Sequence, residues 1–237
     1  MSIIMKWFPP SWYQIRTETM IIYIDPAYLK KHFVTYSKKI EFASWPDPID
    51  GLPEDLEKGD FILITHHHKD HCKQVTVNRL LDHDTVVVAP KVCKKELGEQ
   101  IRVISAGEAF THRGLHITAV EAYNTEQGNS TKKVHKKGQG VGYLLSIMGR
   151  TFYHAGDTDL IPEMKVLGSV DVAMMPIGGR FTMDIEEAAK AVHILKPKFV
   201  FPMHLLGADP LEFKRIVESQ SDIQVVVLET GEFFELD

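Results

Sequence analysis

Short apolar runs separated by Gly, Pro and charged residues recur along the chain, and this pattern predicts many strands and few helices. The clearest run is Phe61 to Ile64, which is typical of a strand buried on both faces. Turn residues predict hairpins at Arg113-Gly114 and at Gly149-Arg150. In chain order, the predicted strands span residues 12–16, 20–24, 61–64, 85–89, 101–104, 109–111, 115–122, 141–148, 151–154, 170–175, 199–202, 224–228 and 232–236.

Helical periodicity is best marked over residues 184–195. Asp184 and Glu187 have the spacing of a capping box, and apolar residues then recur three and four apart to form a buried face. Weaker signals predict a short helix near Leu160 and helices over residues 27–37, 70–81, 92–97 and 210–219. Strands in meandering runs, interrupted by single helices, predict two packed sheets with helices outside, an α/β (α+β) fold. Since no linker-like stretch divides the sequence, we predict a single domain over residues 1–237.

Composition narrows the function classes. The chain has 237 residues, 44% hydrophobic and 25% charged, as is ordinary for a globular enzyme. Its formal net charge of −5 argues against a nucleic-acid partner, which would require a basic surface. Cys72 and Cys93 are the only cysteines, so no disulfide framework is expected. Because no apolar run approaches the roughly 20 residues that cross a bilayer, and the start does not resemble a signal peptide, we expect a cytoplasmic protein without a membrane partner. A homo-oligomer is compatible with the sequence.

Four candidate metal ligands follow the 61–64 strand: His66, His68, Asp70 and His71. In extended backbone, side chains two residues apart point the same way, so His66, His68 and Asp70 would share one side. A turn into a helix at Asp70 would aim His71 separately, and His67 alternates away toward the surface. Imidazole nitrogens with a carboxylate favour zinc, with manganese, iron or nickel as alternatives, over calcium or magnesium.

The remaining ligands of such a site must come from later strand ends. Asp157 follows the 151–154 strand, His204 follows the 199–202 strand, and His135 lies in the polar loop of residues 124–139. His116 is the alternative to His135, but it falls on a predicted strand face in or near the core. The set suits two divalent ions that share an activated hydroxide. In this arrangement the first zinc ion is bound by His66, His68 and His135, the second by Asp70, His71 and His204, and Asp157 bridges both.

Several motifs together resemble one enzyme family. His66-x-His68-x-Asp70-His71, Gly156-Asp157-Thr158 and the late His204 resemble the metallo-β-lactamase superfamily, over nearly the whole chain from Ile22-Tyr23-Ile24-Asp25-Pro26 onward. The resemblance implies a four-layer αββα sandwich with a dinuclear site at one edge between the sheets. The branch that contains L-ascorbate-6-phosphate lactonase is the most similar, on the motifs Tyr153-His154-Ala155-Gly156-Asp157-Thr158, Thr182-Met183 and Pro202-Met203-His204.

Two departures from the family pattern bear on pocket shape and leave every ligand in place. Many members carry a glycine shortly after the Asp-His pair, where this chain has Cys72-Lys73-Gln74. After His204 a Gly or Tyr is usual, whereas Leu205-Leu206 follow here.

These observations predict a metal-dependent hydrolase. A hydroxide bridging the two ions would attack the substrate, and Asp70 would orient this nucleophile and take up a proton after the attack. The resemblance favours a small anionic ester, lactone or phosphodiester as substrate. A nuclease or phosphodiesterase on the same fold is one alternative, and a non-catalytic metal-binding protein is another. A di-iron redox protein is disfavoured because such relatives carry Glu at the position of His68.

The loop from Lys132 to Lys137 surrounds His135 with four lysines. It either forms a solvated surface or draws an anionic substrate toward the metals. On the second interpretation, Lys136, Lys137 and Arg180 contact the substrate.

Three other residues have less specific signals. His154 precedes Asp157 by three positions and is a candidate for orienting the ligands through hydrogen bonds. Trp45, in a segment rich in Pro, would be a lid over the site or an anchor for its loop. Cys72 adjoins a ligand but is interpreted as a small packing residue.

Overall fold

The computed structural model describes residues 2–27 and 56–236. The chain divides into two compact units, the first made of residues 1–103 and 229–237 and the second of residues 104–228. The single-domain assignment stays a prediction. The predicted helix over residues 27–37, after its first residue, and the segment with Trp45 lie outside the described residues.

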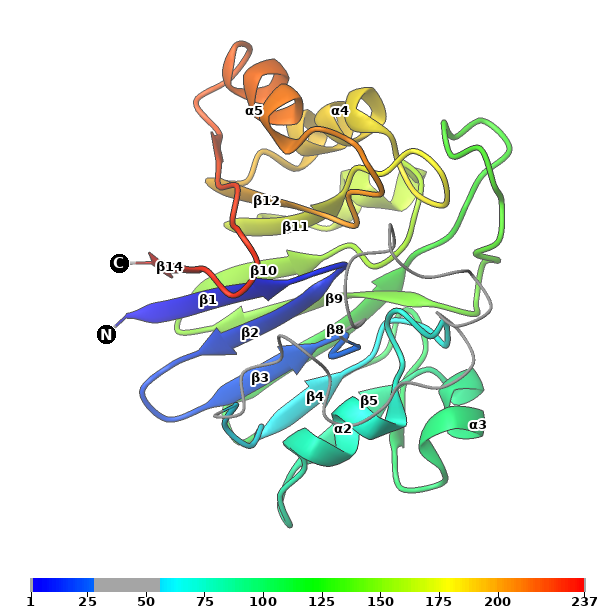
Figure 1. Ribbon diagram of the computed structural model, residues 1–237, viewed down its shortest axis with the longest axis vertical. Helices are drawn as coiled ribbons and strands as arrows, with labels where there is room; N and C mark the ends of the chain where they lie inside the picture. Colours follow the sequence, from blue (N-terminus) through cyan, green and yellow to red (C-terminus); the bar gives the residue numbers. More distant parts are fainter. Residues whose placement is uncertain (1, 28–55, 237) are drawn as a thin grey trace. The chain divides into compact units, whose positions relative to one another are not determined.

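The first unit is built on a mixed sheet of seven strands. In spatial order these are β14 (Phe233–Leu236), β1 (Ile3–Phe8), β2 (Trp12–Arg16), β3 (Ile21–Ile24), β4 (Phe61–Leu63), β5 (Val86–Ala89) and β6 (Arg102–Val103). The pairs from β14 to β3 are antiparallel and those from β3 to β6 are parallel. Helix α2 (Gln74–Leu80), the 3-10 turn η1 (Lys91–Cys93) and α3 (Lys94–Leu97) connect the parallel strands (Figure 1). Val77 and Leu80 of α2 pack with Tyr23 and Ile62 of the sheet.

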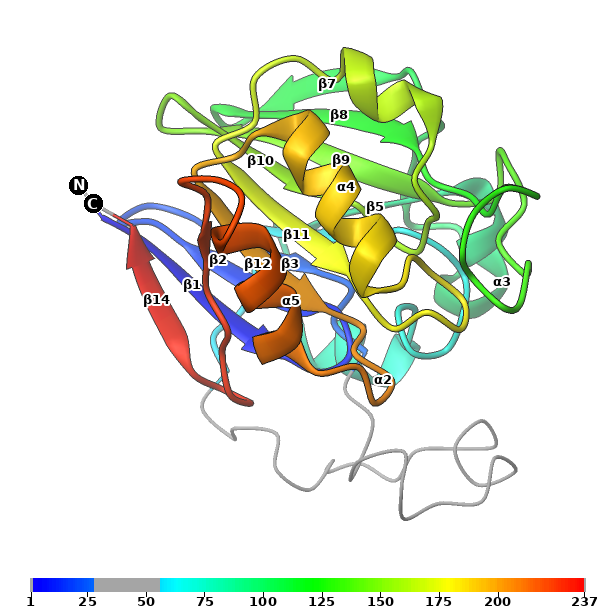
Figure 2. The ribbon, with the colours of Figure 1, turned by 90° about the horizontal axis from the view of Figure 1, so that it is seen from above.

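The second unit contains another mixed sheet of seven strands. In spatial order these are β13 (Gln224–Val225), β12 (Phe199–Met203), β11 (Val172–Pro176), β10 (Arg150–His154), β9 (Val141–Ile147), β8 (Leu115–Glu121) and β7 (Ala109–His112). The strands from β10 to β13 pair parallel, and the remaining pairs are antiparallel. The 3-10 helix η2 (Pro162–Val166), α4 (Ile185–Leu195) and α5 (Pro210–Glu218) complete this unit, and α4 and α5 lie side by side (Figures 1 and 2).

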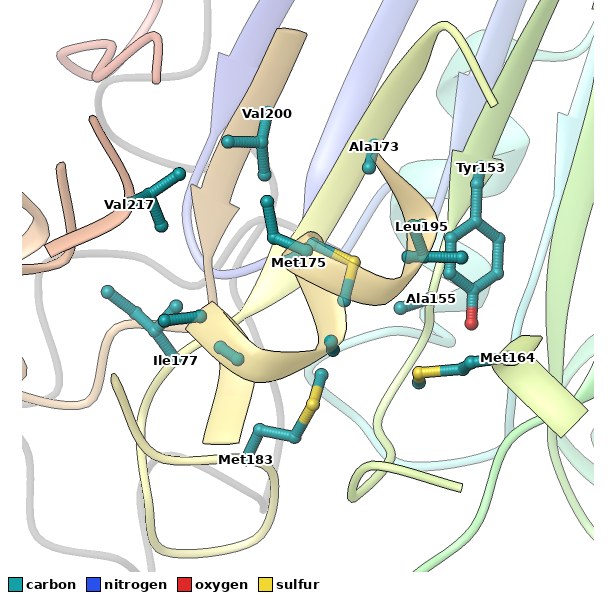
Figure 3. Packing of buried hydrophobic residues seen from close by; sticks show 14 of the residues in the cluster. Tyr153, Ala155, Met164, Ala173, Met175, Ile177, Met183, Leu195, Val200 and Val217 are labelled. Atoms are coloured by element: carbon teal, nitrogen blue, oxygen red, sulfur yellow. The ribbon is translucent and has the colours of Figure 1, made fainter. Parts of the chain in front are cut away.

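The core of the second unit joins its parallel strands to α4 and α5. Tyr153, Met175 and Val200 come from three neighbouring strands and share a buried cluster with Leu195 of α4 and Val217 of α5 (Figure 3). Burial of each large apolar side chain contributes about 1.5–3 kcal/mol. The loops that leave the carboxyl ends of β10, β11 and β12 therefore start from a well-packed base.

Most predicted elements are confirmed, with boundary shifts that have local causes. The strand β1 was not predicted, and the predicted 70–81 helix begins only at Gln74. The second hairpin turns at Met148-Gly149, one residue early, because both residues adopt positive φ, 52° and 79°. The capping box of α4 is half formed: the Asp184 carboxylate accepts from the Glu187 amide, but the Glu187 carboxylate accepts from the Asn129 amide instead.

His116 does not lie in or near the core as predicted. It is exposed on β8, where its ring lies within hydrogen-bond distance of Thr111 and Thr118. Side chains alternate between the two faces of a strand, and the neighbouring Leu115 and Ile117 point to the buried face, so His116 points to the exposed face. Across residues 2–27 and 56–236, no helix has the length and apolar character that a membrane crossing needs.

Candidate metal centre

The ligand run of the first unit leaves the carboxyl end of β4. Because β3 and β4 are parallel neighbours, Asp25 after β3 and Thr65 after β4 emerge at the same sheet edge. In open sheets with parallel strands, this edge is where ligands usually bind. His66, which follows this fully buried strand, therefore lies at the same edge of the sheet, and only 4% of its surface is exposed.

Within the run, the four predicted ligands form two pairs. His66 Nε2 lies 3.0 Å from His68 Nδ1. The amides of His71 and Cys72 both donate to the His68 carbonyl, at 3.0 and 2.8 Å, and this tight turn redirects the chain. As a result His71 Nε2 lies 3.9 Å from Asp70 Oδ2. His67 is exposed, as its alternation in sequence predicted.

Asp25 supports both pairs and was not selected from the sequence as a site residue. Its Oδ2 lies 2.7 Å from His71 Nδ1 and accepts a 2.7 Å hydrogen bond from the Thr65 hydroxyl, while Oδ1 accepts from the Thr65 amide at 2.7 Å. The Thr65 hydroxyl in turn lies 3.0 Å from His66 Nδ1. A carboxylate on Nδ1 fixes the ring and leaves Nε2 for a metal. The available signal was an acidic residue directly after a buried strand, the same signal that marked the ligand run.

The two residues that follow the run, Cys72 and Lys73, are buried. Burial, reinforced by the charge of Lys69, lowers the pKa of Lys73 to about 8. Cys72 is fully buried, and a hydrogen bond with Cys93 together with burial raises the pKa of its thiol. A protonated, enclosed thiol agrees with a packing role for Cys72.

The candidate ligands of the second unit converge on one carboxylate oxygen. His135 Nε2 lies 3.3 Å and His204 Nε2 lies 3.2 Å from Asp157 Oδ2. Asp157 follows β10 and His204 follows β12, while His135 precedes β9, which runs antiparallel to β10, so all three loops lie at the same end of this sheet. The side chains of the three residues are at most 6% exposed.

His204 also has an unusual backbone. Its φ of 50° lies in the left-handed region, which is uncommon for a residue other than glycine. Such backbone conformations cost on the order of 1–3 kcal/mol and occur at functional sites. The Cβ that an alanine would add at Gly178 would lie 2.4 Å from the His204 carbonyl, so the neighbouring loop can approach His204 only because residue 178 is a glycine.

His154 and the lysine-rich loop have defined contacts. The amide of Gly156 donates to His154 Nδ1 at 3.2 Å, which shapes the turn that carries Asp157. Lys137 lies 2.7 Å from the Glu163 carboxylate, which raises the pKa of Lys137 and lowers that of Glu163. One lysine of the loop is thus held by an ion pair, and both interpretations of the loop stay predictions.

Arg180 is brought beside this loop by main-chain hydrogen bonds. Its carbonyl accepts from the Lys132 amide at 2.7 Å, and its guanidinium lies over the Phe181 ring at 5.1 Å. Arg180, Lys132 and Lys136 are exposed.

A cleft of about 430 Å³ lies in the second unit beside the turn that follows His204. Its walls are the loop before α4, the first turn of α4 and the segment from Leu206 to Ala208. The lining mixes apolar Ile177, Ile185 and Leu206 with the carboxylates of Asp184 and Glu186.

The donor sets of both units fit a divalent transition metal. Ligand atoms about 2.0–2.2 Å from a tetrahedral ion lie roughly 3.2–3.6 Å from one another. The spacings of 3.0 Å in the first unit and 3.2 and 3.3 Å in the second are close to this range. Imidazole and carboxylate together suit zinc and its transition-metal neighbours.

Comparison with known proteins confirms the α/β fold class of the metallo-β-lactamase type. A family model described as the Beta-lactamase superfamily domain matches residues 5–204, and the chain belongs to this family. The UPF0173 metal-dependent hydrolase of Pyrococcus furiosus is 35% identical over 220 residues, which are 86% of this chain and 95% of the relative.

Two solved structures have similar folds over nearly their full lengths. A protein of Parabacteroides distasonis has a TM-score of 0.79 and 29% identity, covering 96% of this chain and 93% of the other. The metallo hydrolase Igni18 of Ignicoccus hospitalis has a TM-score of 0.75 and 28% identity, covering 100% and 99%. Together with the family match, the relatives confirm the predicted enzyme class, a metal-dependent hydrolase.

Proposed function

We propose that the two ligand sets act together as a dinuclear centre that hydrolyses a small anionic ester, lactone or phosphodiester. One ion would be held by His66, His68 and His135, the other by Asp70, His71 and His204, with Asp157 shared by both. The observation that carries the proposal is the approach of two imidazole nitrogens, from His135 and His204, to a single oxygen of Asp157. A carboxylate flanked in this way is suited to lie between two ions, one for each histidine.

The way the ligands of the first unit pair with each other supports the same assignment of ligands to two ions. His66 and His68 approach each other, and Asp70 and His71 form a second pair after the turn at His68. The donor chemistry favours zinc, with manganese, iron or nickel as alternatives. When bound, two such ions supply an acidified water as nucleophile and polarise the carbonyl or phosphoryl oxygen of the substrate.

The protein's own residues would orient and transfer protons. Asp70 is partly exposed, so its carboxylate is open to the solvent side of the site, where it can orient a water and accept a proton. Asp25 keeps His71 in the tautomer with Nε2 available. His154 supports the turn of Asp157 through the Gly156 amide.

The anionic character of the substrate is supported by cations near His135 in the second unit. Lys136 directly follows His135 and begins the turn in which its carbonyl accepts from the Gln139 amide. A main-chain hydrogen bond holds Arg180 beside Lys132. Lys137 is already paired with Glu163, so Lys136 and Arg180 are the stronger candidates for substrate contact. The cleft beside the turn that follows His204 would receive an uncharged part of the substrate, because carboxylates and apolar side chains line it.

The experiment is a substrate screen with defined metals. Protein stripped with a chelator is reloaded with zinc, manganese, iron or nickel, and metal content is measured alongside hydrolysis of phosphorylated lactones, other esters, cyclic nucleotides and phosphodiesters. We expect two ions per chain and turnover of a lactone or ester carrying phosphate or carboxylate. One ion per chain in fully active protein would contradict the dinuclear assignment.

The same screen separates the alternatives. Preferential cleavage of labelled RNA or DNA, falling steeply with salt, would favour a nuclease. Lack of turnover on every substrate by protein with two bound ions would favour a non-catalytic metal-binding protein. A lactone preference would support the lactonase-like branch, which rests on the motif resemblance.

A further inference from the structure

The loop of residues 124–139 presents His135 without help from a helix or strand, so other contacts must hold its ring. His135 is nevertheless 8% exposed and has its Nε2 at Asp157. The contacts that hold it converge on one side chain, Asn124, which starts the loop. They suggest a role for Asn124 that neither the motifs nor the ligand set includes.

The Asn124 amide oxygen faces the histidine. It accepts hydrogen bonds from the amides of Val134 and His135, at 3.0 and 2.9 Å, and lies 3.2 Å from His135 Nδ1. The main-chain N–H of Asn124 donates to the main-chain carbonyl of His135 at 2.8 Å. Both ends of His135, main chain and ring, are therefore in contact with one residue.

The side-chain nitrogen of Asn124 faces the opposite way. It donates to the Phe181 carbonyl at 2.8 Å, to Asp159 Oδ1 at 3.1 Å and to the Ser130 hydroxyl at 3.2 Å. Since two main-chain N–H groups point at the oxygen and a carbonyl and a carboxylate at the nitrogen, the orientation of the amide is determined by its partners. A rotated amide would place donors against donors.

An ion pair between a buried carboxylate and a partly exposed lysine fixes Asn124 in turn. The Asp159 side chain is fully buried, and its Oδ2 lies 3.0 Å from Lys133 Nζ and accepts from the Thr125 amide at 2.8 Å. Lys133 also donates to the Gly128 carbonyl and the Ser130 hydroxyl. An added Cβ at Gly128 would lie 2.2 Å from Asp159 Oδ2, so the loop closes on the carboxylate with no spare room.

The tautomer of His135 follows from these contacts. Its Nδ1 lies 3.2 Å from the Asn124 oxygen and 3.1 Å from the Phe181 carbonyl, and both of these atoms are acceptors. Nδ1 must therefore carry the proton, which leaves the Nε2 lone pair toward Asp157. This is the form that a metal ligand requires.

We infer that Asn124 is a positioning residue for His135, held by the Asp159–Lys133 ion pair, and that Lys133 serves this network rather than the substrate. The inference rests on the proposed function, since it assumes that His135 binds metal. It assigns to the lysine-rich loop two kinds of lysine: Lys133 is structural, whereas exposed Lys136 remains available to an anion.

The test compares four variants by chelator competition, which measures metal affinity directly. We expect Asn124→Ala to lower metal affinity about 10–100-fold, as loss of outer hydrogen-bond partners of ligands commonly does. Asn124→Asp should not restore the metal affinity, because a carboxylate oxygen in place of the amide nitrogen would face two other acceptors, the Asp159 carboxylate and the Phe181 carbonyl. Lys133→Met, which keeps the aliphatic stem, should lower affinity by a smaller factor. Asn129→Ala is the matched control, because it removes one exposed hydrogen bond, to Asp184, from the same loop.

A second measurement separates positioning from plain stabilisation. A metal that binds only the native state should raise the melting temperature. A purely structural role of Asn124 would lower the metal-free and metal-loaded values equally. We expect the metal-induced rise itself to shrink in Asn124→Ala and Lys133→Met. An unchanged rise in both variants, or full affinity in Lys133→Met together with a raised KM, would overturn the inference; the second outcome would make Lys133 a substrate cation.

His135→Ala distinguishes failure of this inference from failure of the proposed function. If His135→Ala keeps full metal affinity, the ligand assignment itself is wrong. If His135→Ala loses affinity while Lys133→Met and every folded Asn124 variant keep it, only the positioning role is wrong. Lys133→Met also decides the case if the Asn124 variants do not fold.

Discussion

The two candidate ligand sets are built in different ways. In the first unit, the ligands lie within the consecutive residues from His66 to His71, after one buried strand, and Asp25 supports them from the neighbouring strand. In the second unit, His135, Asp157 and His204 come from three loops that are far apart in sequence. A left-handed backbone nevertheless occurs at both places, at Asp25, which supports the first set, with φ 49°, and at His204, a ligand of the second set, with φ 50°.

The difference shows two routes to the same donor chemistry. A local run needs only a strand end and one tight turn, so the geometry is largely inherent in the order of residues. A dispersed set depends on the register of parallel strands and on hydrogen bonds that hold a loop, as at Asn124. The dispersed set should therefore be sensitive to changes in residues that are not themselves ligands, such as Asn124.

The largest effect is expected at the residue shared between the two ions. Asp157→Ala should remove bound metal and lower kcat by more than about 100-fold, because even indirect partners of ligands cost 10–100-fold. Metal analysis and steady-state kinetics check this. The exposed Asp222 provides the control, since Asp222→Ala should change neither quantity. An Asp157→Ala protein with full metal content would contradict the bridging role.

Asp25→Asn tests whether the first set also depends on support from outside the run. The neutral amide cannot accept from His71 Nδ1 and Thr65 as the carboxylate does, so we expect metal affinity to fall about 10–100-fold. Chelator competition measures the affinity. Asp60→Asn is matched to it, because Asp60 accepts from the Ile21 amide at the opposite end of β3 and should affect folding stability only. Equal affinity loss in both variants would point to a general folding defect.

Glu163→Gln tests the contribution of the ion pair that joins Lys137 of the 124–139 loop to Glu163 of η2. The hydrogen bond from Lys137 lowers the pKa of the Glu163 carboxyl below its ordinary value of 4.5. The pair therefore stabilises the fold at pH 7, and this contribution is lost as the pH falls through the lowered pKa of Glu163. Since the pair is largely exposed, the melting temperature at pH 7 should fall by less than about 3 °C.

The pH dependence supplies the check on Glu163→Gln. The difference in melting temperature between variant and parent should begin to shrink near pH 4.5, the ordinary pKa of a Glu carboxyl, and disappear only below the lowered pKa of Glu163, where the parent carboxyl is protonated. The exposed Glu126, in the same loop, is the control through Glu126→Gln. A difference that persists at low pH would mean that packing, rather than charge, is responsible.

The smallest effect is expected at His67. Its side chain is exposed, so His67→Ala should leave metal content and kcat within about twofold of the parent. His68→Ala, one residue further on, should lower both, because His68 Nδ1 lies beside His66 Nε2. A loss in His67→Ala equal to that in His68→Ala would contradict the assignment of faces along the run.

The ligand run and the elements with strong periodicity were predictable from sequence. The helix over residues 184–195 was confirmed to the residue at its C-terminal end, because its buried face recurs three and four apart. The 61–64 strand was predicted because a short, uninterrupted apolar run is typical of a strand buried on both faces. The strand β1 was missed because its pattern of buried and half-buried residues includes Lys6 and two aromatic residues and lacks a distinct turn signal before it.

The sequence by itself determined which donor types are present and that they follow buried strands, since residue order and strand periodicity are local properties. Tertiary structure decided which partners support them: Asp25 reaches His71 because β3 and β4 are parallel neighbours, and Asn124 reaches His135 because the loop folds back onto it. These contacts join residues 46 and 11 positions apart. Their geometry depends on strand pairing and loop closure, which no local pattern in the chain encodes.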